Sequence, residues 1–254
     1  MKAVYFEKAG KEDVLVYGDV PDPKIGPRQV LVRVKAIAIN RKELMARERG
    51  PAEGVPFVID GSEVAGVIEA IGSEVKDRTV GQRVVASVPT GGYVELLAVH
   101  RAGTVLLPDT LSFEEGASIP NVFLTGWYAL VKLARIEAGE TVLVQAAGSG
   151  VGMAGIQIAK YFGCKVITTA GSEEKVAKAR QFGADLAINY QEKDFVPEVM
   201  AFTDGHGANV CQECVGGDVL IKSIQALGHL GRLVVVGNAS QSPVPPDLLR
   251  RLGS

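Results

Sequence analysis

Short apolar runs separated by turn residues fill the first part of the chain. They lie at residues 3–6, 29–39, 61–71, 83–88, 93–99 and 104–107. Runs of this length, rich in Val and Ile, are typical of β-strands. Turn signals such as Pro21-Asp-Pro and Gly91-Gly92 separate them. This half of the chain is therefore predicted to be a small antiparallel β-barrel.

After about residue 120 the apolar runs alternate with helical patterns. The runs lie at residues 141–145, 165–169, 186–189, 208–214 and 232–236. Such alternation predicts a parallel, doubly wound sheet in an α/β fold. Between the halves, Ser112-Phe-Glu-Glu has the form of a capping box, and the segment to Ala134 looks helical. We expect two domains, residues 1–120 and 121–254.

One strand of the second half runs directly into a glycine-rich turn. The strand is predicted at Thr141–Gln145, the turn at Ala147–Gly150, and an amphipathic helix from Gly152 onward. Glycines let the backbone approach a pyrophosphate, and the free N–H groups of the helix start meet its charge. The predicted phosphate-binding residues are Gly148, Ser149, Gly150, Val151 and Gly152.

The end of the next strand bears on the choice of nicotinamide cofactor. An NAD site usually has an acid there for the ribose 2′-hydroxyl, whereas this strand ends in Gly171-Ser172 with Lys175 one turn later. A hydroxyl, a cation and a helix N-terminus suit a 2′-phosphate, which favours NADPH. Glu173 and Glu174 compete with this interpretation, although acids in a first helical turn also complement the helix dipole.

A turn follows the last predicted strand. Gly237 and Asn238 lie in this turn, at the carboxyl end of the strand, which in a parallel sheet faces the ligand crevice. They are candidates for the nicotinamide side of the cofactor. The alternative is a turn that simply leaves the sheet.

Composition narrows the class of partner. The 254 residues carry 27 Lys and Arg against 29 Asp and Glu, so the net charge of −2 offers no footprint for nucleic acid. The chain has no apolar stretch of about 18 residues, so no membrane partner is expected. Three cysteines form no disulfide framework, which favours a cytoplasmic protein. A small molecule is the expected partner.

Several motifs in order resemble the medium-chain dehydrogenase/reductases, most closely their zinc-free quinone oxidoreductase (zeta-crystallin-like) branch. In chain order they are Met-Lys-Ala-Val from Met1, Ala-Ile-Ala-Ile-Asn-Arg from Ala36, Gly-Ser-Glu-Val-Ala-Gly from Gly61 and Val-Gly-Gln-Arg-Val from Val80. Gly-Gly-Tyr-Val-Glu follows from Gly91, Leu-Thr-Gly-Trp-Tyr from Leu124 and Ala-Ala-Gly-Ser-Gly-Val-Gly from Ala146. The resemblance implies a GroES-like catalytic domain, a Rossmann domain and NADPH-dependent reduction of a quinone or conjugated carbonyl.

The same resemblance implies roles for three further residues. Asn40 and Thr125 match family positions near the nicotinamide, and Tyr190 matches a tyrosine against the adenosine phosphate. A helix-capping role for Asn40 and a packing role for Thr125 are the alternatives. No catalytic acid stands out, and a quinone needs none, since its reduced oxygens can take protons from solvent.

No metal is expected. Zinc-dependent relatives would carry Cys, His and Cys ligands at positions that align with Asn40, Ser62 and about Asn121 here, and none of these is a good zinc ligand. The Cys211-Gln-Glu-Cys214 sequence lacks a second cysteine pair. On a strand its two thiols would point to opposite faces, so a buried structural role is favoured over a redox or metal role.

Family members continue for several tens of residues beyond the equivalent of Leu252-Gly-Ser254. These supply a sixth Rossmann strand, which often pairs across a homodimer, and a segment that completes the catalytic domain. We therefore expect an exposed strand edge and an incomplete barrel, unless an oligomer covers them. Two alternatives to a quinone or enone reductase stay open, namely an enoyl-thioester reductase and a non-catalytic NADPH-binding module.

Overall fold

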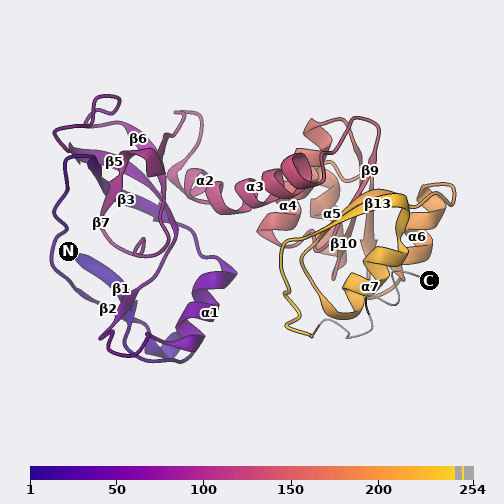
Figure 1. Ribbon diagram of the computed structural model, residues 1–254, viewed down its shortest axis with the longest axis horizontal. Coiled ribbons are helices and arrows are strands. Elements are labelled where there is room, and N and C mark those ends of the chain that lie inside the picture. The colour runs from indigo at the N-terminus through magenta and orange to yellow at the C-terminus, as the bar shows by residue number, and fades with distance from the viewer. Residues whose placement is uncertain (244–247, 249–254) are drawn as a thin grey trace. The chain divides into compact units, whose positions relative to one another are not determined.

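The structure, a computed structural model, describes residues 1–243 and 248. The chain forms two compact units, Met1–Asn121 and Val122–Ser254 (Figure 1). The expectation of a shortened end at residues 252–254 falls outside the described residues. No helix in the described part of the chain is long and apolar enough to cross a membrane.

The first unit is built on antiparallel strands. A five-stranded sheet has the order β7-β3-β5-β6-β8, and a three-stranded sheet has the order β2-β1-β4. The strands are β1 Lys2–Phe6, β2 Val16–Asp19, β3 Gln29–Ile37, β4 Val58–Ile59, β5 Glu63–Ile71, β6 Arg83–Ser87, β7 Leu96–His100 and β8 Thr104–Leu106. Side chains alternate across the sheet, so Val30 and Val32 of β3 are fully buried together with Val64 and Ile68 of β5.

Short helices complete this unit. The predicted capping box is confirmed at α2 (Phe113–Ala117), where Ser112 Oγ accepts from Glu115 N at 3.1 Å and Glu115 Oε2 accepts from Ser112 N at 2.7 Å. Helix α1 (Arg41–Arg49) was not predicted. Its only buried residue is Glu43, so it carries no apolar stripe by which the sequence would reveal it. Two 3-10 turns lie at Glu12–Val14 and Arg101–Gly103.

The second unit holds a five-stranded sheet with the order β11-β10-β9-β12-β13. Every neighbouring pair in it is parallel. The strands are β9 Thr141–Val144, β10 Lys165–Ala170, β11 Leu186–Asn189, β12 Ala208–Glu213 and β13 Leu227–Val235, and the helices between them are α4 Gly150–Tyr161, α5 Glu173–Gln181, α6 Phe195–Phe202 and α7 Gly217–Gln225. The strand order is that of a Rossmann sheet, so the predicted α/β fold class is confirmed.

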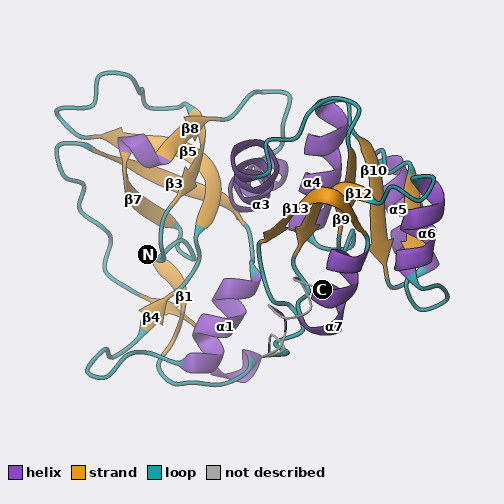
Figure 2. Ribbon diagram, turned by 45° about the vertical axis from the view of Figure 1, so that its right-hand side comes forward, coloured by secondary structure: helices purple, strands orange, loops and turns teal. Residues whose placement is uncertain are grey.

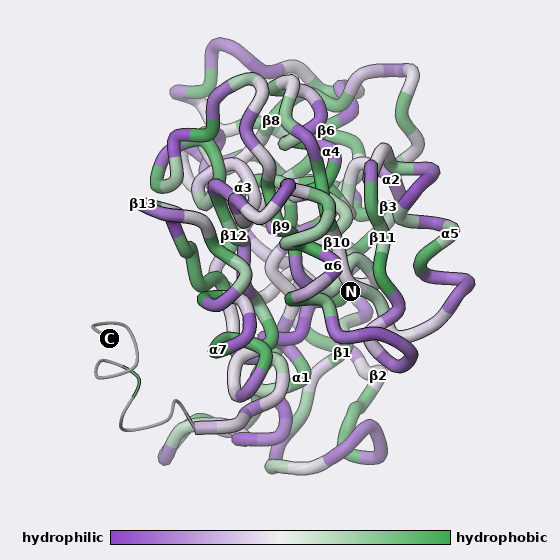
Figure 3. The backbone as a smooth tube through the Cα atoms, turned by 90° about the vertical axis from the view of Figure 1, so that its right-hand side faces the viewer, coloured by the Kyte–Doolittle hydropathy of each residue, from purple (hydrophilic) through white to green (hydrophobic). Residues whose placement is uncertain are grey.

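Helices cover both faces of this sheet (Figure 2). On β9, Val142 and Val144 belong to a core cluster with residues of α4 and α5, while Leu143 packs with Phe195 and Val199 of α6. All three strand residues are fully buried, which explains why the strand reads as a continuous apolar run. The hydropathy-coloured tube shows the same apolar character in β11 (Figure 3).

A helical segment precedes the first parallel strand. It consists of α3 (Pro120–Trp127) followed by a turn of π-helix, Tyr128–Leu133. Arg232 of β13 donates to the carbonyl of Ala134 at 2.8 Å and pairs with Glu140, which holds the end of this segment against the sheet. The predicted helix to Ala134 is thus present, with a wider last turn.

Candidate functional site

The glycine turn at the carboxyl end of β9 has the geometry of an anion-binding helix start. Ser149 is the N-cap of α4: its Oγ accepts from Gly152 N at 3.0 Å and donates to Ala146 O at 2.9 Å. The N–H groups of Gly150 and Val151 belong to the first helical turn, where no carbonyl of the helix itself can accept from them. These donors and the positive end of the helix dipole suit a phosphate.

Backbone crowding requires glycine within this turn. A Cβ on Gly152 would stand 2.2 Å from the carbonyl oxygen of Ala146, a contact no side chain can make. Ala146 itself has φ +58°, an uncommon conformation for a residue with a Cβ. Strain of this kind collects at binding sites, where the surrounding structure maintains it.

Two pairs of predicted residues come together beside this turn. A Cβ on Gly148 would meet Lys175 Cδ at 2.9 Å, so the lysine stem lies over the glycine turn. A Cβ on Gly171 would meet the Tyr190 hydroxyl at 2.5 Å. Lys175 forms no ion pair with any described residue, and Tyr190 is 53% exposed. The structure therefore gathers a cation, a phenol and the helix start around one edge of the sheet.

Helix α5 begins at the same edge. Ser172 is its N-cap and accepts from Lys175 N at 3.4 Å. Of the two competing acids, Glu173 accepts a hydrogen bond from Asn189 Nδ2 at 2.9 Å. Glu173 thus has a structural partner on β11, in agreement with its interpretation as a first-turn acid of α5.

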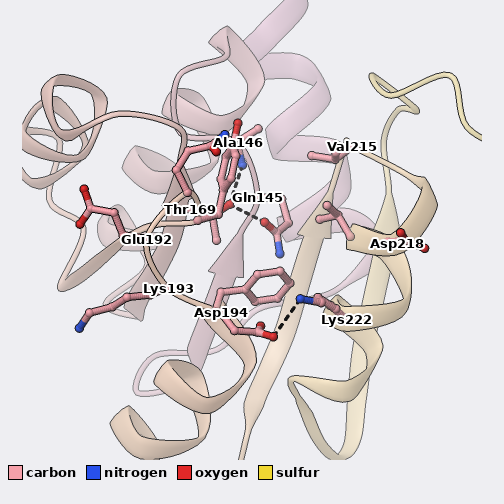
Figure 4. Close-up of a pocket in the computed structure, with 13 residues that line it drawn as sticks. Gln145, Ala146, Thr169, Glu192, Lys193, Asp194, Val215, Asp218 and Lys222 are labelled. Atoms are coloured by element: carbon pink, nitrogen blue, oxygen red, sulfur yellow. Dashed lines mark hydrogen bonds and ion pairs between the residues drawn. The ribbon is translucent and has the colours of Figure 1, made fainter.

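A pocket of about 570 Å³ opens at this edge (Figure 4). Buried Gln145 and Thr169 form its floor, with Thr169 Oγ1 donating to Gln145 Oε1 at 2.5 Å and Gln145 Nε2 donating to Ser223 Oγ at 2.9 Å. The remaining lining comes from residues that follow β9, β11 and β12: Ala146, Tyr190, Gln191, Glu192, Lys193, Asp194, Phe195, Val215, Asp218, Val219 and Lys222. Its size falls within the range of small-molecule sites.

An ion pair joins two helices at the rim of this pocket. Asp194 Oδ2 and Lys222 Nζ lie 2.8 Å apart, and Figure 4 shows them pointing toward one another, Asp194 from the N-cap of α6 and Lys222 from α7. The hydrogen bond from Lys222 and, next, that from Val196 N lower the pKa of Asp194. Neither residue was among the predicted site residues, and neither were Gln145 and Thr169, because only the folded sheet edge brings them together.

The predicted nicotinamide-side residues at the end of β13 are partly engaged in local structure. Asn238 Nδ2 donates to Ser242 O at 2.8 Å, and its Oδ1 accepts from Ser240 Oγ at 3.0 Å. Backbone bonds from Ala239 N to Cys214 O and from Ser240 N to Val215 O tie this turn to the end of β12. Gly237 faces the backbone of Cys214. The Asn238 amide thus shapes the turn.

The other two nicotinamide-side candidates lie in different units. Asn40 is the N-cap of α1 in the first unit, and its Nδ2 donates to Glu63 Oε1 at 2.7 Å. Thr125 lies in α3, half-buried, in the second unit. Asn40 therefore precedes α1, and Glu63 holds its side-chain amide.

The cysteines are free thiols with separate environments. Cys211 is fully buried on β12, whereas Cys214 lies beyond the strand and donates to Gln145 O at 3.6 Å. Burial raises the pKa of Cys214 to about 11 and that of Cys211 further. Among the described residues, no group of three or more His, Cys, Asp or Glu side chains is placed to hold a metal ion.

Family models match both units of the chain. The alcohol dehydrogenase GroES-like domain matches residues 26–109, and the zinc-binding dehydrogenase domain matches residues 150–251. A quinone oxidoreductase of Pseudomonas aeruginosa is 39% identical, covering 94% of this chain and 74% of its own length. The human quinone oxidoreductase is 34% identical, covering 97% of this chain and 76% of its own.

Solved structures give the same relationship. The Escherichia coli quinone oxidoreductase complexed with NADPH superposes with a TM-score of 0.90 at 31% identity, covering 99% of this chain and 78% of that one. The CurK enoyl reductase gives 0.86 at 28% identity, covering 95% and 75%. The chain belongs to the quinone oxidoreductase family of the medium-chain dehydrogenase/reductases, and it is an oxidoreductase.

Proposed function

We propose that the protein uses NADPH to reduce a quinone or an α,β-unsaturated carbonyl compound. The observation that carries the cofactor assignment is the position of Lys175, whose side chain lies over Gly148 beside the start of α4. A cation at this place, without an ion-pair partner among the described residues, is suited to a 2′-phosphate.

The remaining residues of the sheet edge fit the same cofactor. Gly148–Gly152 would bind the pyrophosphate. The turn is tight enough for this because Gly152 has no Cβ, which would clash with the carbonyl oxygen of Ala146. Ser172, Gly171 and Tyr190 would surround the 2′-phosphate together with Lys175. The pocket floored by Gln145 and Thr169 would take the adenosine. Glu173, one of the two acids that compete with this interpretation, is bonded to Asn189.

Asn40, Thr125, Gly237 and Asn238 are proposed for the nicotinamide end. For Asn238 the support is its backbone at the carboxyl end of β13, since its amide is bonded locally. NADPH supplies the hydride when bound. The protein has to orient the acceptor against it and exclude water, so no dedicated acid is required for a quinone.

We further infer a cytoplasmic homodimer. Three free thiols agree with a reducing compartment. Within the described sheet, β13 pairs on one side only, and an unpaired edge is a surface on which a second copy can dock. Light scattering coupled to size-exclusion chromatography measures the mass in solution, and a strictly monomeric mass would refute the dimer.

The function is tested by following NADPH absorbance with 1,4-benzoquinone, 9,10-phenanthrenequinone, a simple enone and an enoyl thioester as acceptors. We expect the fastest oxidation with a quinone or the enone. A clear preference for the enoyl thioester would assign the protein to the enoyl reductases. NADPH-dependent thermal stabilisation without oxidation by any acceptor would instead identify a binding module.

A further inference from the structure

A buried carboxylate in the first unit connects two segments that are far apart in sequence. Glu63 begins β5 and is only 1% exposed. Its Oε1 accepts from Asn40 Nδ2 at 2.7 Å, and its Oε2 accepts from the backbone N–H of Asn121 at 2.7 Å. Both oxygens of one side chain thus hold donors from different helices.

Those two donors stand at two helix starts. Asn40 is the N-cap of α1, and its own N–H is held by Glu43 Oε2 at 2.7 Å. Asn121 is the second residue of α3, where the N–H has no acceptor within the helix. A negative charge at this end of α3 is also favoured by the helix dipole.

The neighbourhood makes a purely structural role for this carboxylate costly. Ser62 Oγ donates to Glu43 Oε1 at 2.5 Å, and Asp60 is buried nearby with Oδ2 unpartnered. Burial is the main cause that raises the pKa of Asp60, and the charge of Glu43 adds to it. Burying carboxylates costs desolvation, and neighbouring carboxylates repel one another.

We propose that Glu63 is a positioning residue for the nicotinamide end of the cofactor. One of its oxygens holds the Asn40 side chain, and the other holds the N–H of Asn121 in the same unit. The inference rests on the proposed function, because it assumes the role assigned there to Asn40. Two N–H donors require two acceptor oxygens. Glutamine at this position would supply one, so one of the two segments would lose its anchor.

The test compares Glu63→Gln with Glu69→Gln. Both positions lie on β5, but Glu69 pairs with Arg33 at the surface, so the second variant controls for the same change on the same strand. The measurements are the affinities for NADPH and for 2′,5′-ADP, which lacks the nicotinamide, the melting temperature without ligand, and kcat with its primary isotope effect from deuterated NADPH.

For Glu63→Gln we expect NADPH affinity to fall about tenfold and kcat to fall about ten- to a hundredfold, with a larger isotope effect because hydride transfer becomes slower. Affinity for 2′,5′-ADP should stay within error of the Glu69→Gln value, while the melting temperature should fall modestly, because one buried donor loses its acceptor. Identical behaviour of the two variants would overturn the proposal. So would a joint loss of both affinities with a lower melting temperature, since that is a general folding defect.

Failure of the proposed function gives a different pattern. If none of the acceptors led the wild-type protein to oxidise NADPH, the reductase assignment would fail. The comparison of NADPH with 2′,5′-ADP affinity would still decide the role of Glu63, because it needs no turnover.

Discussion

At the scale of single residues, one close approach requires glycine in the turn, that of position 152 to the carbonyl oxygen of Ala146. Replacing Gly152 by Ala would place a Cβ 2.2 Å from that oxygen, so the turn must open. We predict that Gly152→Ala weakens NADPH binding by at least about tenfold, because the backbone N–H groups at the start of α4 no longer point at the pyrophosphate. Isothermal titration calorimetry measures the affinity.

Gly155→Ala is the matched control for this prediction. It makes the same change one turn later on α4, where the new Cβ would meet the buried amide of Gln212 at 2.6 Å. This variant should lose stability and lose less affinity than Gly152→Ala, because it reaches the turn only through the bond from Gln212 Nε2 to Val151 O. Equal losses of NADPH affinity in the two variants would show that the turn has no special part in binding.

Cys214 gives a residue-scale prediction about pH. Burial raises the pKa of its thiol from 9.0 to about 11. The folded protein therefore holds the proton more tightly than the unfolded chain. The stabilisation is complete below pH 9 and is lost as the pH rises toward 11. At pH 9, iodoacetamide should modify Cys214 far more slowly in native protein than in urea, as mass spectrometry can show. Equal rates would contradict the burial.

The position of some candidate-site residues at one sheet edge could be predicted from the sequence. Gly148, Ser172 and Lys175 follow the ends of two predicted strands, and parallel strands bring such ends to one edge. Asp194 and Lys222 could not be found in this way. They stand 28 positions apart, Asp194 at the N-cap of α6 and Lys222 within α7, and only the packed sheet brings them within 2.8 Å.

At the scale of elements, two helices with serine N-caps offer a paired test. Ser172 caps α5 beside the proposed 2′-phosphate, and Ser112 caps α2 in the first unit. Replacing either by Ala should reduce the free energy of unfolding by about 1 kcal/mol. Only Ser172→Ala should also weaken NADPH relative to NADH, because only that hydroxyl is near the proposed phosphate. Denaturant unfolding and calorimetry measure the two effects.

The result for Ser112→Ala sets the reference. If it shifted the NADPH to NADH ratio as much as Ser172→Ala did, the ratio would be reporting general stability. The placement of the 2′-phosphate at α5 would then lose its support.

Elements were predictable where they bury an apolar pattern. The strands of the parallel sheet are nearly continuous apolar runs because both faces are covered, and α4 carries an apolar stripe. Helix α1 buries only Glu43, and β4 has two residues, so neither presents a pattern. Strand β13 begins at Leu227 and not at Arg232 as the sequence predicts, because its first residues are defined by pairing with β12.

At the scale of the whole molecule, motif order was more informative than any single motif. The GroES-like and zinc-binding dehydrogenase models cover separate parts of the chain in that order, and the relatives match almost its whole length. Family membership therefore agrees with the expectation from the sequence. The acceptor could not be predicted, because no residue pattern in the chain distinguishes a quinone from an enone.

We propose that this oxidoreductase selects NADPH through Lys175. The most direct measurement is calorimetric titration of NADPH and NADH into wild type, Lys175→Ala and Lys178→Ala, the last removing an exposed lysine from the same helix. We expect Lys175→Ala to weaken NADPH binding by about 2 kcal/mol, roughly thirtyfold, with little change for NADH, and Lys178→Ala to change neither affinity. Equal weakening of both nucleotides by Lys175→Ala would contradict it.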